Sequence, residues 1–418
     1  MRVLIRTFGC ELNRADSQMI AKLFEGNPIE VVDSEEDADA VVVNTCTVRE
    51  ETEHKVLKYI SSLGRKKVVA TGCMAAAQPG LLRYNFPEIS IVTLNNLHDM
   101  IRALQGGVIS VKKGDSLSKP ASFTRGLVHT IPISRGCLGE CSYCIVRLAR
   151  GKLLSVAPEE ILQIIENAVV SGALEIRLAA QDTGVYGKDI GASLVSLLNR
   201  AVAIPYEFRV RVGMFNLSSV SSCFDELMEC YTSNKIYKFV HIPLQSGSDR
   251  ILSIMRRGYT AELYLEAVSD MRRRFPQMTL ATDVIVGYPG ETEDDFRETC
   301  KVLDSITPDK IHISRFAPRP HTPAALLKQI PEPVKKARSR ILTSKKIAIQ
   351  TERNRGWIGR EVEATALSYR RGFGVVARTD EYKPVIVECA AHSTLGARLL
   401  LEVVGCSPFS LTGRIIRR

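Results

Sequence analysis

The chain has 418 residues, 45% of them hydrophobic and 24% charged, which is an ordinary globular composition with enough length for two or three domains. Its formal net charge of +10 favours an anionic partner, with nucleic acid ahead of an acidic membrane surface. The start MRVLIRTFGC has no features of a secretory signal, and no apolar run approaches the roughly 20 residues that span a bilayer, so we predict a cytoplasmic protein without a membrane partner.

From residue 1 to about residue 105, short apolar runs alternate with helical segments. The helical segments are Arg14–Phe24 and Glu50–Leu63, and the apolar runs are Val3–Phe8, Ile29–Val32, Ala40–Asn44, Val68–Thr71 and Ile89–Thr93. This alternation predicts an N-terminal parallel α/β domain with helices on the faces of its sheet. Residues 106–127 are polar and rich in Gly and Ser, which predicts a linker.

The alternation restarts in residues 128–331. Its apolar runs are His129–Ser134, Glu175–Ala180, Phe208–Gly213, Val240–Gln245, Leu280–Gly287 and Lys310–Phe316, with helical segments between them. Six β/α units in this length are too few for the eightfold barrel, which uses about 250 residues. We therefore predict a partial (β/α)6 barrel as the central domain.

The segment Lys335–Arg360 carries nine basic residues and one acid, and residues 332–356 read as a basic connecting helix. Such a one-sided charge favours contact with RNA phosphates, although a solvated surface helix is the ordinary alternative. The RNA-contact candidates are Lys335, Lys336, Arg338, Lys345, Lys346, Arg353 and Arg355. Residues 357–418 contain short strand patterns separated by turns, which predict a small closed β-barrel. Trp357 stands at its entry, as a core anchor or as a platform for a base.

Eleven cysteines in a reducing compartment favour metal binding or catalysis over disulfides. Cys137, Cys141 and Cys144 form a C-x3-C-x2-C motif directly after the first predicted barrel strand. Soft thiolates suit iron–sulfur clusters or zinc, but a structural zinc site normally needs four ligands. Three ligands leave one iron of a 4Fe-4S cluster open to chelate S-adenosylmethionine, whose one-electron cleavage releases a 5′-deoxyadenosyl radical. A zinc knuckle and coincident core cysteines are the alternatives.

Cys10, Cys46 and Cys73 are far apart in the sequence, yet each follows a predicted strand. Because the carboxyl ends of parallel strands share one edge of a sheet, the three thiols should converge there. Gly9 and Gly72 directly precede two of them and permit tight turns beside a bulky cofactor. We predict a second cluster at this edge; the alternative is three unrelated buried cysteines.

Other polar or glycine residues lie at the ends of predicted barrel strands. Asp182, Gln245 and Ser246 could hold substrate or cofactor, or could cap loops. Gly287 and Pro289 could border the S-adenosylmethionine pocket, or could form a structural turn. The remaining cysteines lack ligand spacing, and we predict packing roles for them; they are Cys223, Cys230, Cys300, Cys389 and Cys406.

The stretch SRGCLGECSYCIVR resembles the radical S-adenosylmethionine superfamily, in which the aromatic at the position of Tyr143 lies against the adenine of the cofactor. GCELNRADSQ, NTCTVRE and ATGC resemble the N-terminal domain of methylthiotransferases. This resemblance covers essentially the whole chain. It implies two 4Fe-4S clusters, an auxiliary one on Cys10, Cys46 and Cys73 that holds the transferred sulfur and a radical one on the C-x3-C-x2-C motif, and a C-terminal barrel of the TRAM type.

The branch of the family follows from further motifs. QSGSDRILSIMRRGYT (Gln245–Thr260) resembles the tRNA-modifying members, and QDTGVYGKDIG (Gln181–Gly191) and RVGMFN (Arg211–Asn216) resemble the threonylcarbamoyladenosine branch. Gln181 departs from the Glu usual in that branch, its Gln-Asp-Thr triplet also occurs in the ribosomal branch, and His321 stands where Gly is usual. The alternatives are isopentenyladenosine 37, a ribosomal-protein aspartate, and an iron–sulfur RNA-binding sensor without turnover.

The resemblance implies that one S-adenosylmethionine methylates a sulfur on the auxiliary cluster, while a second yields the radical that activates C2 of adenosine 37. A ring C–H is not acidic, which explains why a radical is required. The implied partners are the anticodon loop of tRNA, splayed to present its base, and a reductase or a donor of the flavodoxin or ferredoxin type. The sulfur donor is left open.

Overall fold

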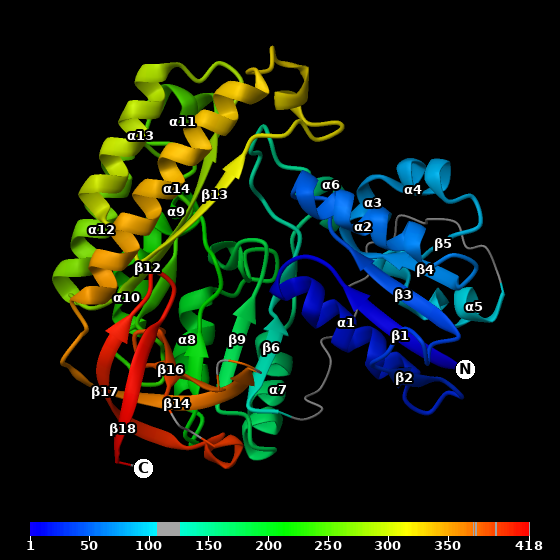
Figure 1. The fold of residues 1–418 in the computed structure, drawn as a ribbon, viewed down its shortest axis with the longest axis horizontal. Helices are drawn as coiled ribbons and strands as arrows, with labels where there is room; N and C mark the ends of the chain where they lie inside the picture. Colours follow the sequence, from blue (N-terminus) through cyan, green and yellow to red (C-terminus); the bar gives the residue numbers. More distant parts are fainter. Residues whose placement is uncertain (107–125, 371, 373, 389–390, 418) are drawn as a thin grey trace.

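The computed structural model describes residues 1–106, 126–370, 372, 374–388 and 391–417 (Figure 1). Most of the predicted linker, residues 107–125, and Cys389 lie outside the described residues. The chain forms a parallel α/β sheet, a partial barrel covered by helices, and a closed β-barrel, as the sequence predicts. No helix in the described part of the chain combines the length and the apolar character needed to cross a membrane.

The N-terminal sheet is entirely parallel, in the order β2-β1-β3-β4-β5. Its strands are β1 (Arg2–Thr7), β2 (Glu30–Val32), β3 (Ala40–Thr45), β4 (Lys67–Thr71) and β5 (Ser90–Ile91). The central strand β3 is fully buried, because helices and their apolar side chains cover both faces of the sheet. The helices are α1 (Glu11–Phe24), α2 (Glu50–Ser62), α3 (Gly72–Ala77), α4 (Pro79–Asn85), η1 (Leu94–Asp99) and α5 (Met100–Gln105).

The central domain is a six-stranded partial barrel made of two three-stranded parallel sheets, β10-β9-β6 and β11-β12-β13. A parallel bridge between Val210 and Ile236 links the two sheets. The strands are β6 (Val128–Pro132), β9 (Glu175–Ala179), β10 (Arg209–Arg211), β11 (Phe239–His241), β12 (Thr279–Val286) and β13 (Lys310–Arg315). A short antiparallel pair, β7 (Ser134–Arg135) and β8 (Leu154–Ser155), follows the first strand.

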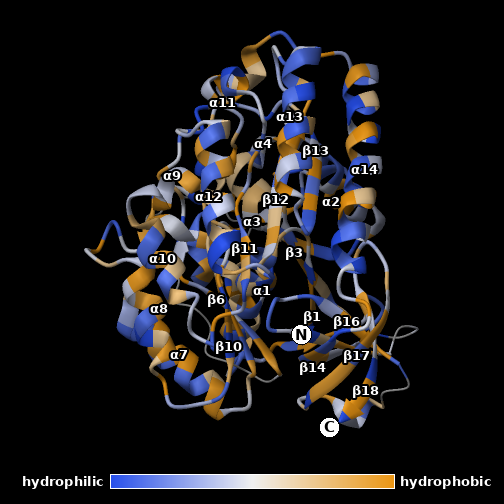
Figure 2. Cartoon of the chain, turned by 90° about the vertical axis from the view of Figure 1, so that its left-hand side faces the viewer, coloured by the Kyte–Doolittle hydropathy of each residue, from blue (hydrophilic) through white to orange (hydrophobic). Residues whose placement is uncertain are grey.

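The barrel helices pack on the outer faces of the strands and enclose the largest apolar core (Figures 1 and 2). The long ones are α7 (Pro158–Val170), α8 (Leu194–Val202), α12 (Ala261–Arg274) and α13 (Glu293–Ile306). The shorter ones are α6 (Val146–Arg150), η2 (Thr183–Val185), α9 (Leu217–Val220), η3 (Ser221–Cys223), α10 (Phe224–Cys230), α11 (Asp249–Met255) and η4 (Pro323–Leu326). Because strand side chains alternate between faces, every second residue points into the barrel instead.

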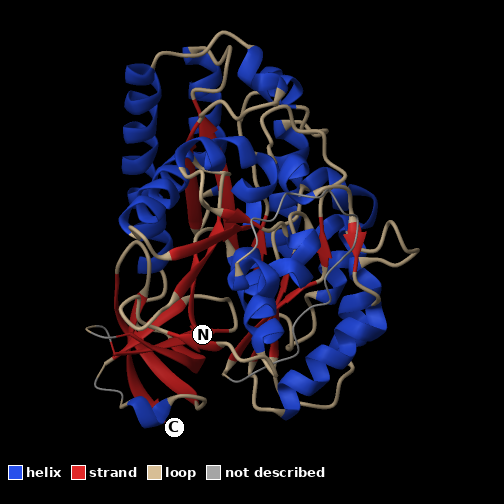
Figure 3. Ribbon diagram, turned by 90° about the vertical axis from the view of Figure 1, so that its right-hand side faces the viewer, coloured by secondary structure: helices blue, strands red, loops and turns tan. Residues whose placement is uncertain are grey.

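Helix α14 (Glu332–Arg355) runs along β13 and leads into the C-terminal barrel. That barrel closes in the order β14-β15-β16-β18-β17, and its strands gather at one end of the molecule (Figure 3). Its elements are β14 (Glu361–Arg370), β15 (Gly374–Thr379), β16 (Pro384–Val387), η5 (His392–Thr394), β17 (Arg398–Cys406) and β18 (Leu411–Arg417). Trp357 is 5% exposed within the barrel core, so the structure places it as a core anchor and not as an open stacking platform.

Candidate functional site

The first cysteine trio lies in the loop between β7 and α6, beyond the carboxyl end of β6. The backbone N–H of Gly139 donates to the Sγ of Cys137 at 3.2 Å. Burial, with smaller contributions from the neighbouring thiols of Cys141 and Cys137, raises the pKa of Cys144 to about 12. The three thiols therefore lie together at the carboxyl ends of the barrel strands, where barrels of parallel strands carry their functional sites.

Arg257, in the loop that follows α11, holds this cysteine loop in place. Its Nη1 lies 3.2 Å from the Sγ of Cys141 and 3.3 Å from the Oη of Tyr143. Its Nη2 donates to Asn216 Oδ1 at 2.7 Å, and its Nε donates to Tyr259 Oη at 3.2 Å. Arg257 is only 6% exposed, so these hydrogen bonds tie the cysteine loop to the interior of the barrel domain.

Each cysteine of the second trio lies beyond the carboxyl end of a strand of the N-terminal sheet. Cys10 is the N-cap of α1, Cys46 follows β3, and Cys73 lies in the first turn of α3 after β4. Cys46 and Cys73 are buried and Cys10 is exposed. Burial raises the pKa of Cys73 to about 11, with a neighbouring arginine opposing the rise and Cys46 and Cys10 adding to it.

Asn13 connects Cys10 of this second trio to the sheet. Its side-chain amide donates to Asn44 Oδ1 and to the carbonyl of Thr45, at 3.1 and 3.0 Å. Its Oδ1 accepts from the Sγ of Cys10 at 3.4 Å. A Cβ on Gly9, whose φ is +120°, would lie 3.0 Å from the Cβ of Cys46. Gly9 therefore lets Cys10 and Cys46 approach each other closely, and a larger residue there would push them apart.

Arg150 joins the two trios. It ends α6, the helix that directly follows Cys144, and this helix packs against α3 of the N-terminal domain. Its Nε donates to the Sγ of Cys73 at 3.3 Å, and its Nη2 lies 2.7 Å from a carboxylate oxygen of Asp16 and 3.2 Å from Asn13 Oδ1. Arg150 is 4% exposed, so one buried side chain close in sequence to the first trio fixes a cysteine of the second.

The two cysteine trios differ from a site for a single metal ion. In the part of the chain that the structure describes, no three His, Cys, Asp or Glu side chains come close enough to share one ion. The cysteines of an iron–sulfur cube each bind a different iron, so their thiols stand farther apart than ligands of one metal. Each trio also has an arginine within hydrogen-bonding distance of a thiol, which suits an anionic thiolate cluster.

Two of the other residues predicted to bind the cofactor cap loops instead. Asp182 accepts from the backbone N–H groups of Gly184 and Asn216 and from the hydroxyl of Ser219, so it caps the loop after β9. Ser246 bonds Thr299 and the N–H of Ser248, which is again a capping role. These contacts favour the structural alternative at both positions.

A contact with the cofactor stays a prediction for three residues, which are Gln245, Gly287 and Pro289. Gln245 adopts φ +67°, and its Oε1 is buried without a partner among the described residues, so it remains available to a ligand. A Cβ on Gly287 would lie 2.4 Å from the Cγ of Lys335, which makes the missing side chain a requirement for packing α14. For Pro289 and the backbone of Gly287, contact with S-adenosylmethionine stays a prediction.

Two of the residues on α14 that the sequence predicts to contact RNA are buried, so the prediction is wrong for these two. Lys335 and Arg338 are each 6% exposed. The Nζ of Lys335 donates to the carbonyl of Phe316 at 2.9 Å, and Nη1 of Arg338 pairs with Glu291 at 2.5 Å. Arg353 and Lys345 are partly buried in ion pairs with Asp309 and Asp304. The exposed members of the predicted set are Lys336 and Arg355, with Lys346 half-buried.

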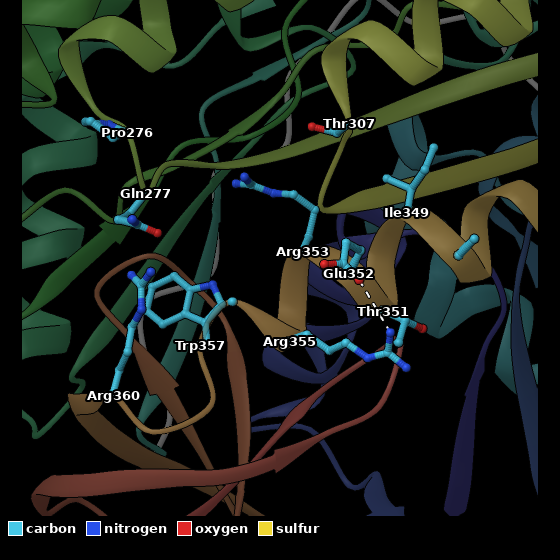
Figure 4. Close-up of a pocket in the computed structure, with 12 residues that line it drawn as sticks. Pro276, Gln277, Thr307, Ile349, Thr351, Glu352, Arg353, Arg355, Trp357 and Arg360 are labelled. Atoms are coloured by element: carbon cyan, nitrogen blue, oxygen red, sulfur yellow. Dashed lines mark hydrogen bonds and ion pairs between the residues drawn. The ribbon is translucent and has the colours of Figure 1, made fainter.

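A groove of about 810 Å³ lies where α14 enters the C-terminal barrel (Figure 4). Gln277 and Thr307 line one side, just before β12 and β13, and Arg353 lines the other. The guanidinium of Arg360 covers the ring of Trp357 at 5.5 Å. Because the groove opens at the amino ends of the barrel strands and the cysteines lie at the carboxyl ends, it is not the site of chemistry.

Sequence reasoning missed Asn13, Arg150 and Arg257, which hold the thiols. Asn13 is three residues after Cys10 on the same helix, so its proximity could have been found from helical spacing. Arg150 and Arg257 contact thiols 77 and 116 positions away, and no local pattern gives such pairs.

Comparisons with known proteins agree with this geometry. Residues 2–93 match the family described as "Uncharacterized protein family UPF0004", and residues 131–303 match the radical SAM superfamily. A probable threonylcarbamoyladenosine tRNA methylthiotransferase from Pyrococcus horikoshii is 40% identical over 397 residues, covering 93% of each chain. One of the same name from Methanocaldococcus jannaschii is 35% identical and covers 100% of this chain and 97% of its own.

More distant relatives extend the similarity. The threonylcarbamoyladenosine tRNA methylthiotransferase of Drosophila melanogaster is 32% identical and covers 99% of this chain and 78% of its own. Among solved structures, the radical S-adenosylmethionine methyltransferase TsrM from Kitasatospora setae has a TM-score of 0.56 at 17% identity, covering 78% of this chain and 75% of its own. At that identity the likeness supports the fold alone.

Proposed function

Because this chain belongs to the family of the threonylcarbamoyladenosine tRNA methylthiotransferases, we propose that it installs a methylthio group at C2 of N6-threonylcarbamoyladenosine 37 in tRNA. The observation that carries the proposal is the pair of cysteine trios, each at the carboxyl ends of parallel strands and bridged by Arg150. Two adjacent trios suit a reaction that needs both a radical source and a sulfur carrier.

The chain's own residues would divide the work. Cys137, Cys141 and Cys144 would hold one 4Fe-4S cluster, and Cys10, Cys46 and Cys73 would hold the auxiliary one. When bound, the first supplies the electron that cleaves S-adenosylmethionine and the second supplies the sulfur. Arg257 and Arg150 keep their thiols oriented and stabilise negative charge on them. Tyr143 and the unpartnered amide oxygen of Gln245 border the space beside the first trio, where the cofactor's adenosyl group would lie.

The RNA would approach over the basic side of the molecule. We infer that Lys336, Lys346 and Arg355 on α14 contact phosphates, together with the exposed Arg340, which the sequence-based set omitted. Phosphate contacts of this kind position an RNA without reading its sequence. The same proposal places the reaction in the cytoplasm, with an electron donor of the flavodoxin or ferredoxin type.

Mass spectrometry of tRNA nucleosides from a deletion strain tests the substrate. The methylthiolated threonylcarbamoyladenosine peak should disappear and return when the wild-type gene is restored. Persistence of the peak in a strain with no second copy of the enzyme would contradict the proposal. Loss of methylthiolated isopentenyladenosine instead would move the substrate to that branch.

Iron content tests the auxiliary cluster. Cys10→Ala should lose about one 4Fe-4S cluster per chain after reconstitution, since one of three thiolate ligands is gone. Cys300→Ala is the matched control, because Cys300 lies on α13 outside both trios.

Formation of 5′-deoxyadenosine by the reconstituted protein separates an enzyme from a sensor. Absence of that product with both clusters present would sink the catalytic proposal.

A further inference from the structure

The inside of the partial barrel carries a belt of charged side chains, defined here as the lumen belt: Arg177, Arg211, His241, Asp283, Lys310 and His312. Their chain neighbours lie in the outer apolar core, so alternation along each strand turns the belt residues inward; these neighbours are Ile176, Val210, Val240, Val284 and Ile311. The belt therefore surrounds the space that opens toward the first cysteine trio.

Contacts hold one side of the lumen belt together. The Nε2 of His241 lies 2.5 Å from Oδ2 of Asp283, and the rings of His241 and His312 are 5.6 Å apart. Asp283 keeps 27% of its side chain exposed although it lies on a central strand, so the space inside the barrel admits solvent. Strand register places Arg211 beside Arg177 and His312 beside Asp283.

Below the belt the barrel is closed. Tyr382, from the turn between β15 and β16 of the C-terminal barrel, packs against Tyr237 and Phe239 with ring centroids 4.9 and 4.8 Å apart. The guanidinium of Arg211 lies 5.1 Å from the ring of Phe239 and 5.9 Å from that of Tyr382. Arg211 thus rests on an aromatic floor.

The charges of the belt do not balance. Arg177 pairs with Glu175 at 2.5 Å and with Glu11 at 3.4 Å, and His241 pairs with Asp283. Among the described residues, Arg211 and Lys310 form no ion pair, and Nε of Arg211 is buried without a hydrogen-bond partner.

The surroundings of Lys310 are positive. Desolvation lowers the pKa of Lys310, and the charges of Arg378, Arg211 and Lys346 lower it further. The charge of Arg49 also reaches Asp283 and His312, from a position three residues after Cys46. Lys310 is exposed and Arg211 is half-buried, so both cations are within reach of an anion that enters the lumen.

We propose that Arg211 and Lys310 bind the carboxylate of the substituent on N6 of the target adenosine, an inference that rests on the proposed function. Arg211 lies on the aromatic floor of the barrel, and Lys310 is the first residue of β13. The subsite therefore lies in the lower part of the barrel lumen, and the charge of Arg49 reaches the belt from the N-terminal domain. A threonylcarbamoyl group has one carboxylate on an otherwise uncharged chain. An isopentenyl group is apolar and would leave both cations unpaired, so the pair also selects the substrate.

The test measures binding of three anticodon stem-loops to the reconstituted holoenzyme by fluorescence anisotropy. The RNAs carry threonylcarbamoyladenosine 37, its methyl ester, or isopentenyladenosine 37. The wild type should bind the acid about tenfold or more tightly than the ester, because the ester keeps the shape and loses the charge. Lys310→Gln and Arg211→Gln should each reduce this acid-to-ester ratio about tenfold. Lys301→Gln, an exposed lysine on α13, removes the same charge as a control and should leave the ratio unchanged.

Thermal unfolding of the same variants guards against a merely structural effect. Removing an unpaired cation should leave the folded state at least as stable as the wild type. A wild type that binds acid and ester equally, or variants that keep the wild-type ratio, would overturn the inference. If this occurs while the wild type still methylthiolates the threonylcarbamoyl RNA, the inference fails and the proposed function stands. If no RNA yields product and an aspartate peptide does, both fail.

Discussion

At the scale of single residues, Arg150 is the side chain on which both cysteine sites depend. It is buried, it contacts Cys73, Asn13 and Asp16, and it stands six residues after Cys144. The cysteines themselves could be predicted from the sequence, because spacing after strands is a local pattern. Arg150 could not, since its partners come from another domain and only the packing of α6 on α3 brings them within reach.

Arg150→Met should destabilise the protein and disturb the auxiliary cluster. It leaves the buried carboxylate of Asp16 without its cation, which costs about 3–5 kcal/mol in comparable cases. Urea unfolding measures the loss, and the electron paramagnetic resonance signal of the auxiliary cluster reports the loss of the hydrogen bond to Cys73. Arg147→Met is the control, because Arg147 lies on the same helix with 48% of its side chain exposed. Equal effects of the two changes would contradict the role given to Arg150.

His312 makes the stability of the protein depend on pH. Desolvation, with Asp283 opposing it and His241, Lys310 and Arg49 adding to it, lowers its pKa from 6.5 to about 4. The unfolded chain therefore binds a proton between pH 6.5 and pH 4 that the folded chain does not, so stability falls as pH falls through this window. His312→Gln should reduce that loss by on the order of 2 kcal/mol.

The measurement is urea unfolding of the metal-free protein at several pH values. His54→Gln, an exposed histidine on α2, is the matched control and should follow the wild type. A His312→Gln curve that runs parallel to the wild type from pH 6.5 to pH 4 would show that His312 titrates normally.

At the scale of elements, α14 shows how a charge run can mislead. The run of basic residues predicts a phosphate-binding helix, yet Lys335, Arg338 and Leu342 are buried along one face. Their spacing of three and four residues is typical of one face of a helix, so periodicity predicts that this face is buried. The count of basic residues alone predicts the opposite. The burial of Lys335 against Gly287 could not be predicted, because it depends on the turn after β12.

Adjacent lysines on α14 should therefore behave differently. Lys336→Ala should change stability by less than about 0.5 kcal/mol, weaken tRNA binding, and lower the slope of log affinity against log salt by about 1. Lys335→Ala should destabilise the protein by about 1–3 kcal/mol, since the carbonyl of Phe316 loses its buried donor. Chemical unfolding and salt titrations of tRNA binding measure the two effects. If Lys335→Ala also lowered the salt slope at full stability, the assignment of Lys335 to the interior would be wrong.

At the scale of the whole molecule, the C-terminal barrel is built into the active domain and does not hang from it. Lys383 pairs with the buried Asp309 at 2.7 Å, and Asp380 pairs with Arg209 at 3.1 Å. The sequence predicted the closed barrel from its strand pattern. The sequence could not predict how this barrel docks on the central domain, because single residues in one turn make the contacts. The consequence is that the C-terminal barrel and the central barrel have a fixed relative position.

Tyr382 is the residue that tests this coupling. Its ring closes the bottom of the barrel against Tyr237 and Phe239, and its hydroxyl donates to Glu175 at 3.2 Å. Tyr382→Ala should cost about 3–5 kcal/mol, as other large aromatic truncations do, and should split one calorimetric transition into two. Tyr369→Ala, with 48% of its residue surface exposed on β14 of the same small barrel, should do neither. A single unshifted transition in Tyr382→Ala would mean that the C-terminal barrel is held by its other contacts, and that the aromatic floor beneath Arg211 contributes little to joining the domains.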